Sequence, residues 1–178
     1  MTSAERLNFM QFVSPVGSIL ICASPEGICQ LHIDRNEVLS GAEAARIVKD
    51  HHGHCEIDAT AHLTLLQEVK TAILDYLGKR TPLPPIPVDL RRGSPFQRQV
   101  WQALHKVPFG ETRSYLQVAA SIGKPSAARA VGQACGRNPI PVIIPCHRVL
   151  ASNGKLGGFS SGLQVKQKLL ELERMAPP

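Results

Sequence analysis

The sequence predicts an α/β fold in two parts, a small sheet-containing N-terminal part and a helical C-terminal part, on three observations. Short runs rich in β-branched residues alternate with Gly and Pro turns at the start of the chain, as in strands. Ser-x-x-Gln motifs, typical of helix starts, occur three times after residue 93. Between these regions, "TPLPPIPVDL" contains four prolines, which favour an extended connector. We therefore expect an N-terminal α/β domain at residues 1–90, with the connector at 81–90, and a helical domain at 91–178.

The composition indicates an ordinary globular protein. The chain has 178 residues, 43% of them apolar, which is enough for a core. No run approaches the roughly 20 apolar residues of a membrane span. The start, "MTSAERLNFM", lacks the basic-then-apolar order of a signal peptide. We therefore expect a cytoplasmic protein without membrane association, in which the five irregularly spaced cysteines are thiols.

Charge is distributed unevenly along the chain. Residues 1–90 have 7 Lys/Arg and 11 Asp/Glu, a net charge of −4, whereas residues 91–178 have 13 and 3, a net charge of +10. Scattered solvated charge is the ordinary explanation of a basic protein. A basic excess confined to one half more often serves a polyanion, most commonly nucleic acid.

The N-terminal part begins with three predicted strands. The runs "NFMQFVS" (8–14) and "SILICAS" (18–24) are joined by the turn "SPVG", which predicts a hairpin, and "GICQLHI" (27–33) adds a third strand. Apolar residues at helical spacing then predict a helix that ends at Gly78: Leu63, Leu66, Val69, Ile73, Leu74 and Leu77.

The segment "HHGHC" contains residue types that ligate metals, namely His51, His52, His54 and Cys55. Its spacing matches no standard zinc pattern, in which two closely spaced pairs of ligands recur. We therefore interpret it as a solvated loop between helices.

The C-terminal part reads as a series of helices. Start and stop signals predict a first helix over residues 94–107, a short second helix over 114–123, a third over 125–136 and a last one from Ser161. The second and third form a helix-turn-helix pattern with a Gly in the turn.

The third helix carries almost no side-chain bulk apart from Arg129. Base readout in the major groove usually needs several long polar side chains. A small, smooth surface suits close approach to DNA along the minor groove. Tight helix–helix packing would explain the same residues, and the pattern alone does not separate the two. The basic charge favours DNA.

Cys146 lies in the most hydrophobic run, "PVIIPCHRVL", beside His147 and Arg148. Pro145 cannot donate to a strand ladder, so the thiol is expected where regular structure breaks. Taken alone, a buried structural cysteine would explain this residue. Basic neighbours, however, favour a reactive thiolate, and Phe159 in the Gly-rich loop that follows can stack on a base. These features indicate a reactive cysteine beside a DNA-binding helix pair.

Together these motifs resemble the O6-alkylguanine-DNA alkyltransferases. The likeness is dense over residues 94–173, through "SYLQVAASIGKPSAARAVGQACGRNPIPV", "PVIIPCHRV" and "GKLGGFSSGLQVKQKLLELE", and weak before them. It implies a ribonuclease H-like N-terminal domain with an antiparallel sheet, followed by the helix-turn-helix domain. It also implies a single-turnover suicide enzyme that transfers the alkyl group of O6-alkylguanine, and of O4-alkylthymine, to its own Cys146.

The resemblance assigns catalytic roles to four residues. Cys146 is the nucleophile, and His147 draws off its proton through a water. Glu173 holds the imidazole in the required tautomer, and Asn138 braces the turn below the site.

The same resemblance assigns the DNA-binding surface and the substrate pocket. The target base leaves the stack, Arg129 fills the gap that it leaves, and Tyr115 helps to rotate the nucleotide and donates to the base. The family usually has Tyr where this chain has Phe159. The remaining residues of the DNA surface and the pocket are Ala128, Cys135, Val149, Phe159 and Ser160.

Some family members bind a structural zinc in the N-terminal part. Two of the cysteine positions hold Glu5 and Ser24 here, and neither Cys22, Cys29 nor "HHGHC" restores the pattern. We therefore expect no metal and no other cofactor.

The expected partner is double-stranded DNA containing O6-alkylguanine, bound by a monomer. The alternative class is a non-catalytic DNA binder. A helix-turn-helix regulator would need base-reading side chains, and a damage sensor of this kind would lack Cys146. A thiol hydrolase is a third option, disfavoured because the Cys–His–Glu set accompanies a DNA-binding element.

Overall fold

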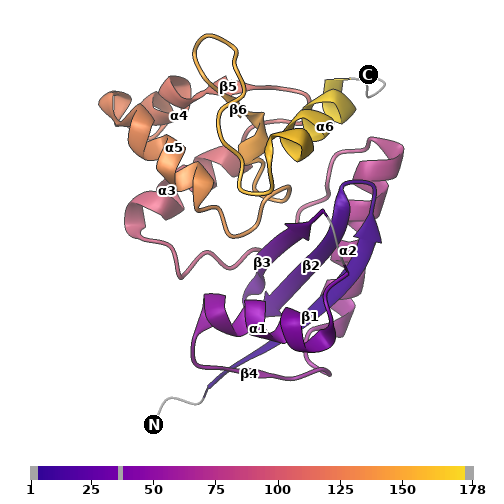
Figure 1. Ribbon diagram of the computed structural model, residues 1–178. Helices are drawn as coiled ribbons and strands as arrows, with labels where there is room; N and C mark the ends of the chain where they lie inside the picture. Colours follow the sequence, from indigo (N-terminus) through magenta and orange to yellow (C-terminus); the bar gives the residue numbers. More distant parts are fainter. Residues whose placement is uncertain (1–3, 36–37, 175–178) are drawn as a thin grey trace. The chain divides into compact units, whose positions relative to one another are not determined.

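The computed structural model describes residues 4–35 and 38–174, and the chain divides into two compact units, Met1–Asp89 and Leu90–Pro178 (Figure 1). Strands and helices both contribute to the fold, so the predicted α/β class is confirmed. Among the described residues, no helix is both long and apolar enough to cross a membrane.

The sheet of the first unit has the strand order β3-β2-β1-β4. β1 (Glu5–Ser14), β2 (Gly17–Ser24) and β3 (Gly27–Asp34) form the antiparallel meander predicted for these runs. β4 (Cys55–Ile57) pairs with β1 in parallel, so the sheet is mixed, and the predicted antiparallel arrangement holds for β1, β2 and β3 but not for β4. Parallel pairing is possible because a long connection, which includes α1 (Gly41–His52), precedes β4.

Helix α1 begins at a capping box, in which the Ser40 side chain accepts from the Glu43 N–H and the Glu43 side chain accepts from the Ser40 N–H. It continues through His51 and His52, and His52 is buried. The interpretation of "HHGHC" as a solvated loop between helices is therefore wrong for His51 and His52, which are helical, and for Cys55, which is in β4, whereas Gly53 and His54 are exposed. The helix ends directly after His52, because Gly53 adopts a positive φ of 67°, which glycine tolerates more readily than other residues.

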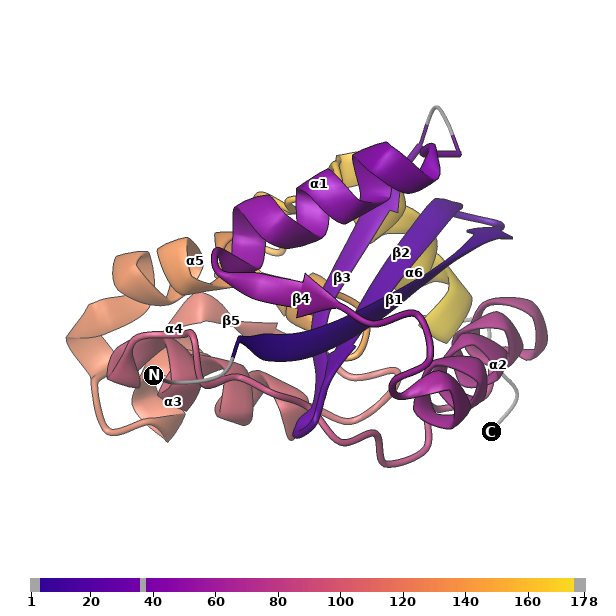
Figure 2. The same cartoon turned by 90° about the horizontal axis from the view of Figure 1, so that it is seen from below.

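Helix α2 (Leu63–Lys79) lies on the opposite face of the sheet from α1 (Figures 1 and 2). It ends one residue beyond the predicted Gly78, where Arg80 adopts the left-handed conformation at φ 58°. Its inward side carries most of the predicted apolar stripe, namely Leu66, Val69, Ile73 and Leu77, together with Tyr76.

The proline-rich segment returns to the edge of the same sheet. The Ile28 N–H donates to the Pro87 carbonyl at 2.9 Å, and the Asp89 N–H donates to the Ile28 carbonyl at 2.8 Å. Gly27, at φ 139°, permits this approach, because a Cβ there would lie 2.5 Å from the Pro87 oxygen. The end of the segment is thus fixed to β3 by backbone hydrogen bonds.

The second unit is mainly helical, with one short parallel strand pair. Its elements are α3 (Pro95–His105), β5 (Arg113–Ser114), α4 (Tyr115–Ser121), the 3₁₀ turn η1 (Pro125–Ala127), α5 (Ala128–Gly136), the 3₁₀ turn η2 (Cys146–Arg148), β6 (Val149–Leu150) and α6 (Leu163–Arg174).

The predicted helix starts at Ser94 and Ser114 are confirmed, since each makes a complete capping box with the Gln three residues later. The start predicted at Ser161 is wrong by one residue, because α6 begins at Leu163 and the residue directly before it is Gly162. The Gly162 carbonyl, not a Ser side chain, begins the helical hydrogen bonds there.

Candidate active site

Cys146 lies at the start of η2, after a turn that is held by Asn138. The Asn138 side-chain amide donates to the Ile144 carbonyl at 2.7 Å and to the Cys146 Sγ at 3.1 Å. Its oxygen accepts from the Ile140 N–H at 3.0 Å. Asn138 is itself buried, so one amide fixes both the turn and the position of the thiol.

The Cys146 thiol is only 3% exposed. Burial raises its pKa to about 11, although the hydrogen bond from Asn138 acts in the opposite direction. Burying a neutral thiol costs little, whereas burying a thiolate costs much more. The thiol therefore rests in its protonated form at neutral pH.

His147, which follows Cys146 in the sequence, forms a buried pair with Glu173, which lies near the end of α6. The distance between His147 Nε2 and Glu173 Oε1 is 2.8 Å. Because an ionised carboxylate only accepts hydrogen bonds, we assign the Nε2 proton to this contact, which makes Nδ1 the basic nitrogen. Burial lowers the pKa of His147, while Glu173 raises it less, so the imidazole is neutral at neutral pH.

Arg148 also binds Glu173, with Nε and Nη2 each 2.9 Å from a carboxylate oxygen, and its Nη1 donates to the Val107 carbonyl. Its guanidinium is therefore engaged with Glu173. This finding corrects the expectation that Arg148 would favour the thiolate of Cys146.

Tyr115 lies half-buried at the start of α4, beside the α5 residue Gly132. A Cβ at Gly132 would lie 3.7 Å from the Tyr115 ring, and a Cβ at Gly157 would overlap its hydroxyl. Burial, followed by the nearby thiols of Cys135 and Cys146, raises the pKa of Tyr115, so its hydroxyl keeps its proton. The structure thus brings Tyr115, Cys135, Cys146 and the glycine loop together.

The remaining predicted residues surround this group. The Phe159 ring meets the His147 ring edge-on, with their centroids 6.5 Å apart. Val149 is buried in β6, and Ser160 is exposed in the loop. Helix α5 has two sides, since Val131 and Ala134 are buried whereas Arg129 is exposed. The Trp101 indole donates to the Ala134 carbonyl at 2.9 Å, so the inner side of α5 packs against α3, and its exposed side is bare apart from Arg129 and Gln133.

Lys166 is a residue of this site that the sequence reasoning missed. It is fully buried, and its Nζ donates to the Val149 carbonyl at 2.7 Å and to the Gly157 carbonyl at 3.4 Å. It thereby ties α6 to the strand after Cys146 and to the glycine loop. Its spacing from Leu169 and Glu173, three and seven residues, places all of them on one helical face and was the available signal.

Known proteins resemble this chain over almost its whole length. A family model described as "6-O-methylguanine DNA methyltransferase, DNA binding domain" matches residues 95–175. A methylated-DNA–protein-cysteine methyltransferase of Methanosarcina barkeri is 41% identical over 90% of this chain and 92% of its own. One of Mycolicibacterium paratuberculosis is 58% identical over 52% of this chain, and that match spans only 56% of the relative's length.

Solved structures agree with these sequence matches. The crystal structure of the Mycobacterium tuberculosis O6-methylguanine methyltransferase has a TM-score of 0.77 at 34% identity, covering 97% of this chain and 95% of that one. A crystal structure of the M. tuberculosis protein OGT in complex with DNA has a TM-score of 0.76 at 35% identity, with the same coverage. The predicted family is thus confirmed: the chain belongs to the methylated-DNA–protein-cysteine methyltransferases, a family of DNA repair enzymes.

Proposed function

We propose that this chain repairs O6-alkylguanine, and also O4-alkylthymine, in double-stranded DNA by transferring the alkyl group irreversibly to Cys146. The observation that carries this proposal is the buried Cys146 thiol, held by Asn138 at 3.1 Å beside the buried His147–Glu173 pair. A soft sulfur nucleophile suits displacement at an sp³ carbon. Amino-acid side chains do not displace the sulfur of a thioether, so each molecule acts once and needs no cofactor.

The thiol must lose its proton before or during attack, because burial keeps it protonated. His147 accepts this proton through a water, while Glu173 holds the Nε2–H and leaves Nδ1 basic. The S–C bond forms as the C–O6 bond breaks, and the electron pair of that bond goes to the guanine. Tyr115, whose hydroxyl stays protonated, donates to the departing base. In sum, one proton passes from the thiol side to the base side.

A base inside the duplex cannot reach a thiol that is 3% exposed, so the nucleotide must turn out of the stack. The exposed Arg129 occupies the gap, and the small Ala128 beside it allows α5 to approach the minor groove. Tyr115 guides the nucleotide. Val149 and Cys135 line the alkyl-group pocket, and the loop with Phe159 and Ser160 closes over the base.

The remaining expectations belong to the same proposal. Helices α4 and α5, with η1 between them, act as a helix-turn-helix in the domain of residues 91–178. Residues 1–90 form a ribonuclease H-like domain. The protein works as a cytoplasmic monomer.

The direct test is mass spectrometry of the full chain after mixing with a duplex that contains one O6-methylguanine. We expect one added methyl group per chain, mapped to the Cys146 peptide, and none with the matched unmodified duplex. Cys146→Ser should abolish transfer, since a hydroxyl is a much weaker nucleophile at sp³ carbon, yet keep DNA binding. A methyl group on Cys135 or Cys29, or repeated turnover by unmodified protein, would overturn the mechanism.

A further inference from the structure

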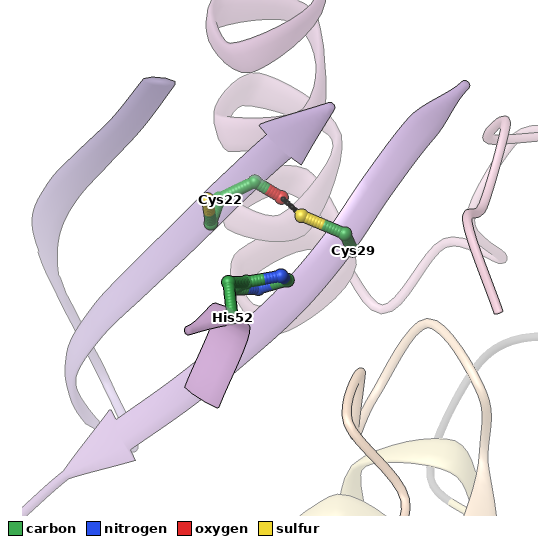
Figure 3. A group of neighbouring side chains, drawn as sticks. All are labelled: Cys22, Cys29 and His52. Carbon is green, nitrogen blue, oxygen red and sulfur yellow. Dashed lines mark hydrogen bonds between the residues drawn. The ribbon is translucent and has the colours of Figure 1, made fainter. Parts of the chain in front are cut away.

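Three ligand-type side chains converge on the α1 side of the N-terminal sheet, in the unit that does not contain Cys146. The Cys22 and Cys29 sulfurs and a ring nitrogen of His52 all lie within 4.8 Å of one another (Figure 3). They come from β2, β3 and the last residue of α1. All three are buried, with exposures of 0%, 4% and 2%.

A β-bulge brings the two thiols to this point. Cys22 is opposite Gln30 and Ala23 is opposite Ile28, so Cys29 is the extra residue of β3. Bulges redirect side chains and recur beside functional sites. The Cys29 Sγ lies 3.4 Å from the Cys22 carbonyl oxygen. The irregularity therefore creates the close approach of the two cysteines.

The His52 imidazole supplies a second, independent observation at the same point. Within the described part of the chain, neither of its ring nitrogens has a hydrogen-bond partner, although the side chain is only 2% exposed. Buried polar groups are nearly always paired, and leaving one unpaired is costly. A metal ion would satisfy one nitrogen directly, at the same point where the two sulfurs already meet.

We propose that Cys22, Cys29 and His52 bind a zinc ion. Two thiolates and one imidazole form a donor set that zinc prefers, whereas harder cations select oxygen ligands. On binding, the two thiols release their protons to solvent and the imidazole binds in its neutral form. A water would complete the four-coordinate site, and the half-buried Cys55 of β4 packs against the hydrophobic cluster that contains Cys22 and Cys29.

This ligand set differs from the one that the family resemblance led us to consider. Two cysteine positions of that set hold Glu5 and Ser24, and the Ser24 hydroxyl donates to Asp89 at 2.7 Å. The site proposed here instead uses Cys22 and the end of α1. A bound ion would fasten β2, β3 and α1 to one another, so its role is structural and independent of alkyl transfer.

The test is the metal content of the full chain, produced with zinc in the medium and dialysed. Elemental mass spectrometry should find about one zinc per chain in the wild type. Cys22→Ser and His52→Gln should each lose most of this zinc. The exposed neighbour provides the matched control, since His54→Gln should keep the metal. Cys146→Ser should also keep it, which excludes the catalytic thiol as the zinc ligand.

A second measurement needs no variant and so does not depend on how the substitutions fold. Cobalt(II) added to the zinc-depleted wild type should produce thiolate-to-cobalt charge-transfer absorption and the intense visible bands of a tetrahedral ion. Zinc that is absent from the wild type, or retained equally by Cys22→Ser and His52→Gln, would overturn the proposal, as would the lack of these cobalt bands.

Discussion

The Cys146 thiol, which we propose as the nucleophile, is neutral in the folded protein. Burial raises the pKa of the thiol to about 11 and lowers the pKa of the neighbouring imidazole of His147, so both are uncharged at neutral pH. A neutral thiol is less open to unrelated oxidants and electrophiles than a thiolate, because the thiolate is the reactive form. A nucleophile used only once benefits from this protection.

These pKa directions predict an unusual pH profile. We expect the single-turnover transfer rate to be nearly constant between about pH 7 and pH 8.5. Over this range His147 is already neutral, and the Cys146 thiol is deprotonated only during the reaction. Rapid-quench kinetics on a methylated duplex would measure it. Attack by a free thiolate in equilibrium would instead raise the rate about tenfold per pH unit over this range.

The same pKa shift affects stability. The unfolded thiol has a pKa near 9.0 and the folded one about 11, so the folded state binds more protons between these values. The contribution of the Cys146 thiol to the free energy of unfolding is fully present below the unfolded pKa of 9.0. It is lost as the pH rises through the folded pKa of about 11.

The Glu173 carboxylate binds two buried groups, the His147 imidazole and the Arg148 guanidinium, so its substitution should affect both the transfer rate and the stability of the fold. In Glu173→Gln the amide can no longer fix the His147 tautomer, so transfer should slow, and the buried Arg148 charge loses its carboxylate. Removing one partner of a buried ion pair typically costs about 3–5 kcal/mol. Urea unfolding and single-turnover kinetics would measure the two effects.

The control for this substitution lies on the same helix. Glu171 is exposed on α6, so Glu171→Gln should leave both the transfer rate and the unfolding midpoint close to wild type. If Glu173→Gln were as stable as Glu171→Gln, the proposed compensation of Arg148 would be wrong.

At the scale of elements, the glycine loop and α4 meet at one contact that a methyl group would break. In Gly157→Ala the new Cβ would overlap the Tyr115 hydroxyl and displace the ring from the pocket. We expect a transfer rate at least about tenfold lower, as for a misplaced positioning group. Gly158→Ala is the matched control, because nothing lies within 4 Å of its Cβ position and its rate should be unchanged. Equal rates in both variants would exclude a role for this contact.

The position of Arg129 on α5 predicts that its substitution will slow the reaction of a duplex substrate more than that of a free base. Arg129 is exposed on the bare side of the helix, and its proposed role is to stabilise an opened duplex. Arg129→Ala should therefore slow repair of duplex DNA much more than dealkylation of free O6-benzylguanine, which needs no opening. The exposed Arg137, just after the same helix, provides the charge-matched control Arg137→Ala. Equal losses on both substrates would mean that Arg129 acts within the pocket or in folding.

At the scale of the whole molecule, charge separates the two halves of the sequence, with −4 on residues 1–90 and +10 on residues 91–178. A repair protein must find rare lesions in any sequence context. Attraction to phosphates provides affinity without sequence selection, since every phosphate has the same charge.

We therefore expect binding to unmodified duplex DNA to weaken by more than about tenfold between about 50 and 200 mM salt. Fluorescence anisotropy on two duplexes of equal length and unrelated sequence would measure this. The two affinities should agree within about threefold, because the bare side of α5 offers few base-reading groups. A flat salt response, or a strong preference for one sequence, would contradict a phosphate-driven mode.

The sequence by itself determined the features that depend on neighbouring residues. The three N-terminal strands and the capping boxes at Ser94 and Ser114 follow from short-range patterns, runs of seven residues for each strand and four residues for each box, and they are confirmed. The family followed from the "PCHR" motif and its distance to the Ala-rich helix, since both lie in one continuous stretch.

Only the tertiary structure decided which distant residues meet. The parallel pairing of β4 with β1, the engagement of Arg148 with Glu173 and the convergence of His52 on two cysteines each join segments more than 20 residues apart. Sequence periodicity predicts which face of an element is buried, but not which element will cover that face. Lys166 shows the same limit, because its buried ammonium is stable only where the Val149 and Gly157 carbonyls accept its protons, and folding alone brings those carbonyls to it.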